Sequence, residues 1–360
     1  MTELSLPSIF AVSPHGHPTE FGRIFPPDRP WLARQPREEI LFPELPIVDA
    51  HHHLWDVPGF RYLVDEFGED VGRDHNVVAT IYAECVSMYR AKGPVSMRPV
   101  GETEFVVGMH AMSASGRFGP AEIARGIIGF SDLRLGARVA EVLDAHLQAA
   151  PDLFKGVRFS TSWDASPQIL SSHTGASPDA FADPAIREGA RTLAAYGLSL
   201  DSWLFHTQLS DLAGLADACP DLVIVMNHCG GPLGYGPYAY DRERHFEDWR
   251  RGVLDVARRP NVVCKLGGLL GRCAAYDYVD AKDPPDSRLL AEIWRPWIET
   301  CIEAFGPARC MFESNFPVEI QGTGYSTLWN TFKRLTVGAS EDERRLLFAG
   351  TAARIYRLSI

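Results

Sequence analysis

The sequence has no apolar run close to the roughly 18 residues that a membrane-spanning helix needs. Its N-terminus also lacks a basic segment followed by an apolar one, so no secretory signal is indicated. Positive charge is scarce, because 35 Lys and Arg stand against 46 Asp and Glu, which gives a net charge of −11. Binding to nucleic acid needs a basic face, so we expect no nucleic acid partner and no membrane partner. A single local Arg could still hold an anionic small molecule.

The cysteines do not form a pattern typical of disulfide-rich or zinc-binding proteins. The seven cysteines are odd in number and form no Cys-x-x-Cys pair, so neither a disulfide framework nor a zinc-ribbon motif is indicated. Most lie in or beside predicted strands and helices, as buried thiols in a reducing cytoplasm do. The glycines at 230–236 have neither of the two nucleotide-binding spacings, so we expect no organic cofactor.

Short apolar, β-branched runs alternate with amphipathic stretches from residue 47 onwards. Eight strands are predicted, beginning at Ile47 and then covering about 77–85, 126–132, 154–160, 198–206, 222–228, 261–266 and 309–315. Helices are predicted over about 102–113, 137–149, 209–218, 245–257, 287–305, 327–335 and 341–349. Near-continuous apolar strands between helices indicate a parallel sheet covered on both faces. Eight such units favour an α/β fold of the closed (β/α)8 TIM barrel type over an open sheet.

No repeat or low-complexity linker divides the chain, so we expect one barrel domain over 41–360. Residues 1–40 are rich in Pro and polar residues and are predicted to form an arm that packs over the barrel or a neighbouring subunit, or else a disordered tail. Long connections at about 161–180, 229–244 and 267–286 follow the fourth, sixth and seventh strands. In a barrel these loops lie on the C-terminal face, where barrel enzymes carry their chemistry.

The most distinctive stretch is 47–56, IVDAHHHLWD, in which an apolar run ends in three histidines. Side chains alternate along a strand, so His51 and His53 are expected on one face and His52 on the other. Two imidazoles on one face can ligate a single divalent ion or hold one polar ligand. A surface His run is the alternative, but such a run would not directly follow a buried strand.

Parallel strands bring the polar residues at their carboxyl ends to a single mouth. His206 and His228 end the fifth and sixth predicted strands, and Glu84, near the end of the second, could point inward. Lys265 and Glu313, on the neighbouring seventh and eighth strands, could be site residues or simply an interior ion pair.

The Asp-Ala-His-x-His motif at the end of a first strand resembles the opening of the amidohydrolase superfamily. Residues 49–56 resemble its amidohydrolase-related branch, which includes 2-pyrone-4,6-dicarboxylate lactonase and sugar lactonases. Further landmarks are 163–167 (WDASP) and 227–231 (NHCGG), and the resemblance covers most of the chain from about residue 46. It implies a (β/α)8 barrel and a metal held by histidines after strands one, five and six, which match His51, His53, His206 and His228.

Two positions depart from the superfamily pattern. The fourth strand carries Arg158 where many members have Lys or Glu; this resembles the lactonase branch, in which such an Arg holds a substrate carboxylate. Many relatives read Gly-Ser-Asp-Trp-Pro after strand eight, whereas residues 313–317 read Glu-Ser-Asn-Phe-Pro. The family Asp binds metal and takes a proton from the attacking water, but Asn315 is neutral and cannot act as a base. Glu313, two residues back on the same face, is the candidate substitute.

We therefore predict a hydrolase that opens a lactone, or a related cyclic ester or amide, of a small carboxylate or sugar-like substrate. One divalent ion, zinc, held by the four histidines would activate water. Without a metal, the imidazoles would stabilise the oxyanion, and His228 or Glu313 would be the base. Arg158 would orient the substrate carboxylate. An apolar wall is expected from Trp163, Trp203, Tyr235 and Tyr240.

Two other functions remain open at this point. A non-oxidative decarboxylase would use a similar pocket, as related amidohydrolase-like barrels do. A non-catalytic binding protein would account for the missing Asp, although the retained histidines weigh against it. The partner expected in each case is a small molecule, and a homo-oligomer is compatible with the sequence.

Overall fold

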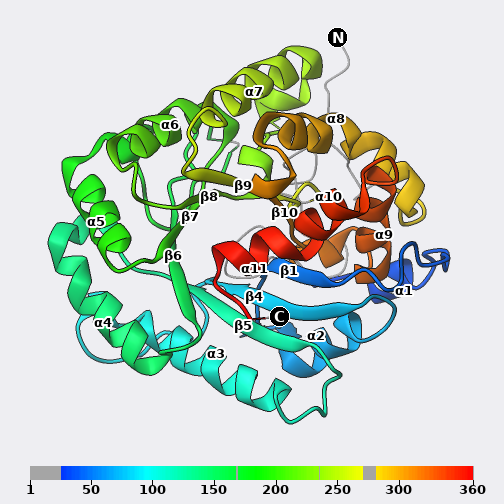
Figure 1. Ribbon diagram of the computed structural model, residues 1–360, viewed down its shortest axis with the longest axis horizontal. Helices are drawn as coiled ribbons and strands as arrows, with labels where there is room; N and C mark the ends of the chain where they lie inside the picture. The colour runs from blue at the N-terminus through cyan, green and yellow to red at the C-terminus, as the bar shows by residue number, and fades with distance from the viewer. Residues whose placement is uncertain (1–25, 168, 235, 271–280, 360) are drawn as a thin grey trace.

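The computed structural model describes residues 26–359 except 168, 235 and 271–280. Its core is a sheet of eight parallel strands in sequence order around a nearly closed barrel (Figure 1). The strands are β1 (Ile47–His52), β4 (Val77–Ala83), β5 (Glu122–Gly129), β6 (Phe154–Ser160), β7 (Ser199–Trp203), β8 (Ile224–Met226), β9 (Val262–Leu266) and β10 (Cys310–Phe312). The predicted fold class and all eight predicted strands are confirmed.

Helices form the outer ring around this sheet (Figure 1). They are α2 (Val64–Val71), α3 (Val100–Ser113), α4 (Val139–Ala149), α5 (Pro184–Ala195), α6 (Leu209–Ala218), α7 (Arg242–Val256), α8 (Ser287–Phe305) and α9 (Tyr325–Leu335). The C-terminal part consists of α10 (Glu341–Arg345), a π-helical turn at Leu346–Gly350, and α11 (Thr351–Ile355). None of the described helices is both long enough and apolar enough to cross a membrane.

Some elements were not predicted. The hairpin of β2 (Trp55–Val57) and β3 (Phe60–Tyr62) has strands of three residues, too short to show alternation. Helix α5 does carry a start signal, because Asp183 caps it by accepting from the backbone N–H of Ala185 and a Pro occupies the first turn. The three long connections do follow β6, β8 and β9, as predicted.

The barrel is closed between β10 and β1 by the segment just after β10. The backbone N–H of Asn315 donates to the His51 carbonyl (2.8 Å), and the N–H of His53 donates to the Phe316 carbonyl (2.7 Å). Asp49, buried in β1, accepts from the backbone N–H of Ser314 (2.8 Å) and from the Tyr325 hydroxyl (2.9 Å). The aspartate of the Asp-Ala-His motif therefore joins the first strand to the last.

The apolar core has two parts. The larger part fills the space between the strands and the surrounding helices. The smaller part joins residues from β1, β4, β5, β8, β9 and β10, which can meet only inside the barrel, and the C-terminal segment packs against them through Ile355 and Tyr356. Figure 1 shows α11 lying across the ring of strands. The described cysteines are all free and buried, as predicted.

The described part of the N-terminal arm, residues 26–40, lies against the barrel and includes the short helix α1 (Arg29–Leu32). The indole N–H of Trp31 donates to the Ala281 carbonyl (3.0 Å). The Glu38 carboxylate accepts from the backbone N–H of Ser287 (2.8 Å) and pairs with Arg334 (3.2 Å). The domain boundary at residue 40 stays a prediction.

Candidate functional site

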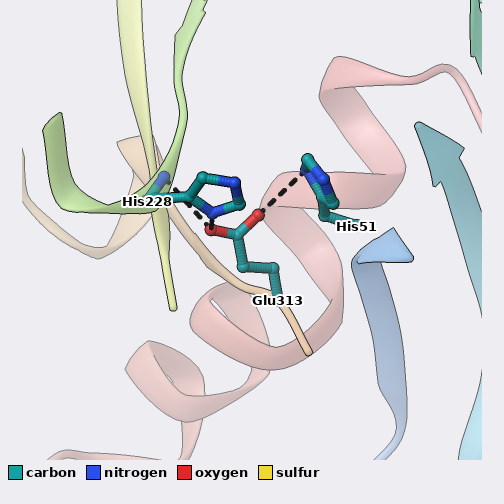
Figure 2. Close-up of side chains that lie close together, drawn as sticks. All are labelled: His51, His228 and Glu313. Carbon is teal, nitrogen blue, oxygen red and sulfur yellow. Dashed lines mark hydrogen bonds and ion pairs between the residues drawn. The ribbon is translucent and has the colours of Figure 1, made fainter. Parts of the chain in front are cut away.

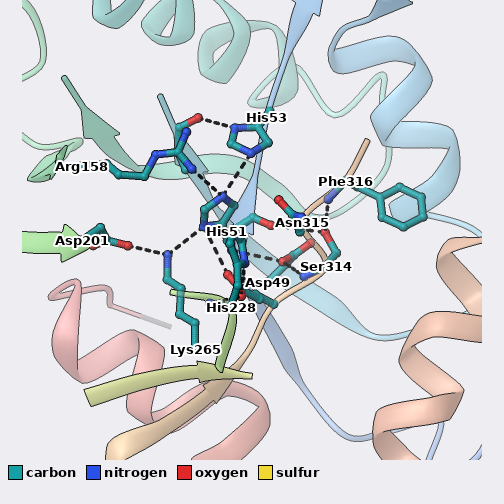
Figure 3. A network of polar contacts seen from close by, with 12 residues as sticks. Asp49, His51, His53, Arg158, Asp201, His228, Lys265, Ser314, Asn315 and Phe316 are labelled. Carbon is teal, nitrogen blue, oxygen red and sulfur yellow. Dashed lines mark hydrogen bonds and ion pairs between the residues drawn. The ribbon is translucent and has the colours of Figure 1, made fainter. Parts of the chain in front are cut away.

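Two imidazoles from the end of β1 meet inside the barrel mouth. The Nε2 atoms of His51 and His53 lie 3.1 Å apart, and Nδ1 of His53 donates to the Ala83 carbonyl (2.8 Å), which leaves its Nε2 unprotonated (Figure 3). Burial lowers the pKa of both imidazoles well below the usual 6.5. Both side chains are therefore neutral, which is the form that ligates metals or accepts protons.

His52 points to the opposite side of β1, as predicted. Its Nε2 lies 2.8 Å from the Thr80 hydroxyl, and its ring stacks on Phe67 with centroids 4.3 Å apart. Burial lowers its pKa to about 3. This histidine packs β1 against α2 and takes no part in the mouth.

His228 and Glu313 form a buried pair beside this cluster (Figure 2). Oε1 of Glu313 accepts from the backbone N–H of His228 (3.1 Å) and lies 2.7 Å from its Nδ1. The ring of His228 lies 4.8 Å from that of His51 and makes an edge contact with Trp203, also at 4.8 Å. A proton on Nδ1 donated to Glu313 leaves Nε2 of His228 with a free lone pair.

An unusual turn positions His228. The φ angles of His228 and Cys229 are both 52°, and those of Gly230 and Gly231 are also positive, at 74° and 59°. Two consecutive side-chain-bearing residues in this region are strained, and such strain accumulates at functional sites. Gly268, with a φ of 65°, lies directly against the ring, because a Cβ there would overlap Nδ1 of His228.

Among the described residues, the group that could hold a metal ion consists of His51, His228 and Glu313, with ligand atoms within 4.8 Å of one another. Two nitrogens bound to one zinc at about 2.0–2.1 Å in tetrahedral geometry lie about 3.3 Å apart. The 3.1 Å between Nε2 of His51 and Nε2 of His53 therefore also fits two ligands on one ion. Imidazole nitrogens and carboxylate oxygens both ligate zinc.

Arg158 reaches the cluster from β6 but is largely occupied by Glu84. Its Nε donates to Oε1 of Glu84 (2.7 Å), and Nη2 donates to the Glu84 carbonyl. Burial alone would lower the pKa of Arg158, but the Glu84 carboxylate outweighs it and raises that pKa. Nη1 is left facing the cluster, 3.4 Å from Nε2 of His51. Glu84 does point inward, as the sequence suggested.

Lys265 does not form the interior ion pair with Glu313 that the sequence left open. Its Nζ lies 2.7 Å from Oδ2 of Asp201, on β7, and 3.3 Å from Nδ1 of His51 (Figure 3). The strand register explains this, since Lys265 lies opposite Met311 and Glu313 lies beyond the end of β10, where it meets His228. Asp201 was missed, although an acidic residue inside a strand was a visible signal.

His206 lies apart from the other three histidines. Its Nδ1 accepts from the backbone N–H of Leu233 (3.2 Å), and its ring contacts Tyr238 with centroids 5.2 Å apart. Burial lowers its pKa to about 4. The Tyr238 hydroxyl donates to Asp164 (2.6 Å), which joins the loops after β6 and β8. The structure thus brings His51, His53 and His228 together, and His206 is not in the group of described residues that could hold a metal ion.

The side chain of Asn315 makes no hydrogen bond to the histidines among the described residues. Its amide donates to Oε1 of Glu319 (3.2 Å), and its φ is 53°. Of the expected wall, Trp203 touches His228 and Trp163 is half-buried, while Tyr240 is 45% exposed. Tyr235 lies outside the described residues.

Comparison with known proteins decides the family. The Amidohydrolase family model matches residues 48–358, which include every strand of the barrel except the first residue of β1.

The chain belongs to the amidohydrolase family.

This amidohydrolase has relatives that span nearly its whole length. It is 31% identical to an uncharacterized Sinorhizobium fredii protein, y4mH, over 88% of this chain and 99% of the relative. It is 27% identical to the L-fucono-1,5-lactonase of Burkholderia multivorans, over 86% of this chain and 96% of that enzyme.

Solved structures share the fold of this amidohydrolase. An amidohydrolase from Burkholderia multivorans with bound zinc superimposes with a TM-score of 0.62 at 23% identity, covering 87% of this chain and 99% of the other. A putative 2-pyrone-4,6-dicarboxylic acid hydrolase from Pseudomonas putida gives a TM-score of 0.55 at 15% identity, covering 88% and 99%. The family and fold together make this chain a hydrolase of the amidohydrolase type.

Proposed function

We propose that this amidohydrolase uses water to open the ring of a sugar-derived lactone. The observation that carries the proposal is the His228–Glu313 pair next to the neutral imidazoles of His51 and His53. An ester carbonyl needs a base to activate water and a donor to stabilise the oxyanion, and His228 offers the first while Nη1 of Arg158, beside the imidazoles, offers the second. The L-fucono-1,5-lactonase relative supports a lactone as the substrate.

His228 is the general base in this proposal. Glu313 accepts the Nδ1 proton and orients the ring, so Nε2 takes a proton from the attacking water. The oxygen of that water bonds to the lactone carbonyl carbon, and the ring C–O bond then breaks. The departing alkoxide takes the proton back from Nε2, which yields the hydroxy acid and restores the neutral imidazole. Glu313 thus orients the base and does not itself act as the base in place of the missing aspartate.

The oxyanion would develop on the side of His51, His53 and Arg158. Nη1 of Arg158 is the part of the guanidinium that Glu84 leaves free, and it faces this cluster. The Nε2 atoms of His51 and His53 would hold a zinc ion, with Glu313 as a further ligand, and such an ion would supply Lewis-acid polarisation of the carbonyl. The zinc in the Burkholderia multivorans amidohydrolase supports this assignment.

A neutral polyhydroxy lactone fits the charge of the site better than a dicarboxylate. Bidentate binding of a substrate carboxylate needs two free nitrogens of one guanidinium. Glu84 already binds Nε and Nη2 of Arg158 and neutralises its charge. A carboxylate-bearing substrate would have to compete with Glu84, whereas a sugar lactone needs only the remaining donor.

A panel of lactones tests the proposal. We expect proton release from L-fucono-1,5-lactone, and less or none from 2-pyrone-4,6-dicarboxylate, each measured with a pH indicator in weak buffer with and without added zinc. His228→Asn should reduce kcat by about 100-fold or more, because general base catalysis contributes about 10²–10⁴-fold. Carbon dioxide release from a carboxylic acid substrate would instead indicate a decarboxylase.

The matched control is His110→Gln. His110 lies on the outer helix α3, where Nδ1 contacts the Ile123 carbonyl (2.9 Å). We expect the turnover of the His110→Gln variant to equal that of the wild type. Wild-type turnover in His228→Asn, with an unchanged circular dichroism spectrum, would exclude His228 as the base.

A further inference from the structure

A buried cation lies beside the site, and the proposed mechanism does not use it. Lys265, Asp201 and Tyr356 are all fully buried. Nζ of Lys265 lies 2.7 Å from Oδ2 of Asp201 and 5.3 Å from the centre of the Tyr356 ring. The Tyr356 hydroxyl lies 3.1 Å from each oxygen of Asp201. These contacts hold the ammonium group at one position, from which it also reaches His51.

Stability gives no reason for this pair. Removing two charges from water is costly, and replacing a buried ion pair with apolar residues of similar volume often leaves a protein equally stable or more stable. The surrounding barrel interior is apolar, with Val225, Val263 and Met311 in the same cluster as Tyr356. A buried ion pair that ends against a site histidine therefore points to a role in the site.

The contact between Lys265 and His51 determines where the imidazole carries its proton. An ammonium group has donors and no acceptor, so its 3.3 Å contact with Nδ1 is a hydrogen bond only if Nδ1 is unprotonated. The neutral ring must then carry its proton on Nε2, which lies 3.1 Å from Nε2 of His53. That nitrogen is an acceptor, because the other nitrogen of His53 donates to the Ala83 carbonyl. The donors thus run in one direction, from Lys265 through His51 and His53 to the backbone.

Two neighbours compete with this arrangement, and neither reverses it. Oε2 of Glu313 lies 3.2 Å from Nδ1 of His51, but it has no partner that meets hydrogen-bond geometry among the described residues. Nη1 of Arg158 approaches Nε2 of His51, but at 3.4 Å it is farther away than the acceptor on His53. Lys265 and Arg158 can only donate to the His51 ring, so its proton lies on Nε2 and is donated to Nε2 of His53.

We infer that Lys265 is a positioning residue that holds metal-free His51 as the Nε2–H tautomer and so weakens divalent-cation binding at the cluster. Ligation through Nε2 requires the proton to move to Nδ1, where Glu313 would become its acceptor. Lys265 opposes that move by donating to Nδ1, and its charge repels the cation. The statement that Lys265 weakens cation binding rests on the metal site of the proposed function. The statement about the His51 tautomer is independent of it.

Nitrogen-15 NMR of histidine-labelled, metal-free protein tests the tautomer directly. Long-range proton–nitrogen correlations distinguish protonated from unprotonated ring nitrogens, and His51→Asn identifies the signals of His51 by their loss. We expect Nε2 of His51 to be protonated in the wild type. In the double variant Lys265→Met/Asp201→Asn, which leaves no unpaired charge, we expect the proton on Nδ1. A wild-type proton on Nδ1, or an unchanged tautomer in the double variant, would overturn the inference.

Zinc affinity tests the consequence, measured by competition with a chromogenic chelator and without substrate. The double variant should bind zinc about 10- to 100-fold more tightly than the wild type, the range typical of residues that contact a metal ligand. Equal or weaker binding would contradict the effect on the cation. Because no lactone is used, absence of lactone turnover would count against the proposed function alone.

Lys333→Met is the matched control for both measurements. Lys333 is also fully buried, and its Nζ contacts an imidazole nitrogen, Nδ1 of His75, at 2.9 Å. It lies on α9, outside the strands of the barrel. We expect the His51 signals and the zinc affinity of this variant to match the wild type; a change equal to that of the double variant would show that loss of any buried lysine produces it.

Discussion

Burial sets the ionisation of single residues around the mouth. Glu102, on α3, is fully buried, and its Oε1 accepts from the Tyr82 hydroxyl (2.9 Å) and from the backbone N–H groups of Cys85 (2.8 Å) and Ser87 (2.9 Å). Burial, followed by the nearby Glu84 carboxylate, raises its pKa to about 8. One carboxyl group therefore organises the turn after β4 while remaining protonated at neutral pH.

This pKa predicts a pH-dependent stability that Glu102→Gln removes. A folded-state pKa above the ordinary 4.5 means that the carboxyl favours folding below pH 4.5 and loses this contribution as the pH rises through about 8. Glutamine keeps the accepting oxygen and never ionises. Between about pH 6 and about pH 9, the free energy of unfolding of the variant should rise by about 2.5 kcal/mol relative to the wild type. Urea unfolding at both pH values measures this, and parallel pH curves would contradict it.

At the scale of elements, the site depends on two connections that follow neighbouring strands. The left-handed turn after β8 carries His228, and Gly267 and Gly268 after β9 make room for the pair it forms. A Cβ on Gly267 would overlap Glu313, and one on Gly268 would overlap His228. Both glycines are therefore required by their close approach to the His228–Glu313 pair.

Gly268→Ala should displace His228 and reduce kcat by about 100-fold, since a shift of about 1 Å in a catalytic group has an effect of that size. Its φ of 65° adds backbone strain for alanine. The control is Gly108→Ala on the exposed face of α3, where a Cβ meets open space. That variant should keep full turnover and gain about 0.5–1 kcal/mol of stability. Unchanged kcat in Gly268→Ala would show that the loop after β9 can move to make room for the added methyl group without displacing His228.

At the scale of the molecule, the barrel is tied together at its seam, through its centre and along its outside. Asp49 joins β1 to the segment after β10, the C-terminal segment fills the interior through Tyr356, and residues 26–40 lie along the outside. Trp31 is buried in the last of these contacts. The arm thus contributes apolar burial as well as the ion pair of Glu38 with Arg334.

Removal of residues 1–40 should therefore lower the free energy of unfolding by about 3 kcal/mol or more, through loss of one buried indole and several hydrogen bonds. Removal of residues 1–25 keeps every one of the described contacts and is the control. Urea unfolding followed by fluorescence and by circular dichroism measures both truncations. Equal stability of the two truncated proteins would show that residues 26–40 do not stabilise the barrel.

Strand order and the main mouth residues could be predicted from the sequence, but most of the pairings could not. The run that ends in His51 and His53 and the apolar strand before His228 carry signals within a few residues. The partners of Lys265 do not, because Glu313 and Asp201 were both available as a counter-charge within the barrel. His206 matched a family pattern by position, yet its ring lies beside Tyr238.

The sequence by itself determined which segments are the barrel strands, that these are parallel, and that His51, His53 and His228 reach one mouth, because hydrophobic periodicity is a local property. Only the tertiary structure decided that Glu313 binds His228, 85 residues away, and that Lys265 reaches across 64 residues to Asp201 and 214 to His51. Hydrogen bonds and buried ion pairs form only when the distance between two atoms is right to within a few tenths of an ångström. Those distances exist only once the barrel has closed.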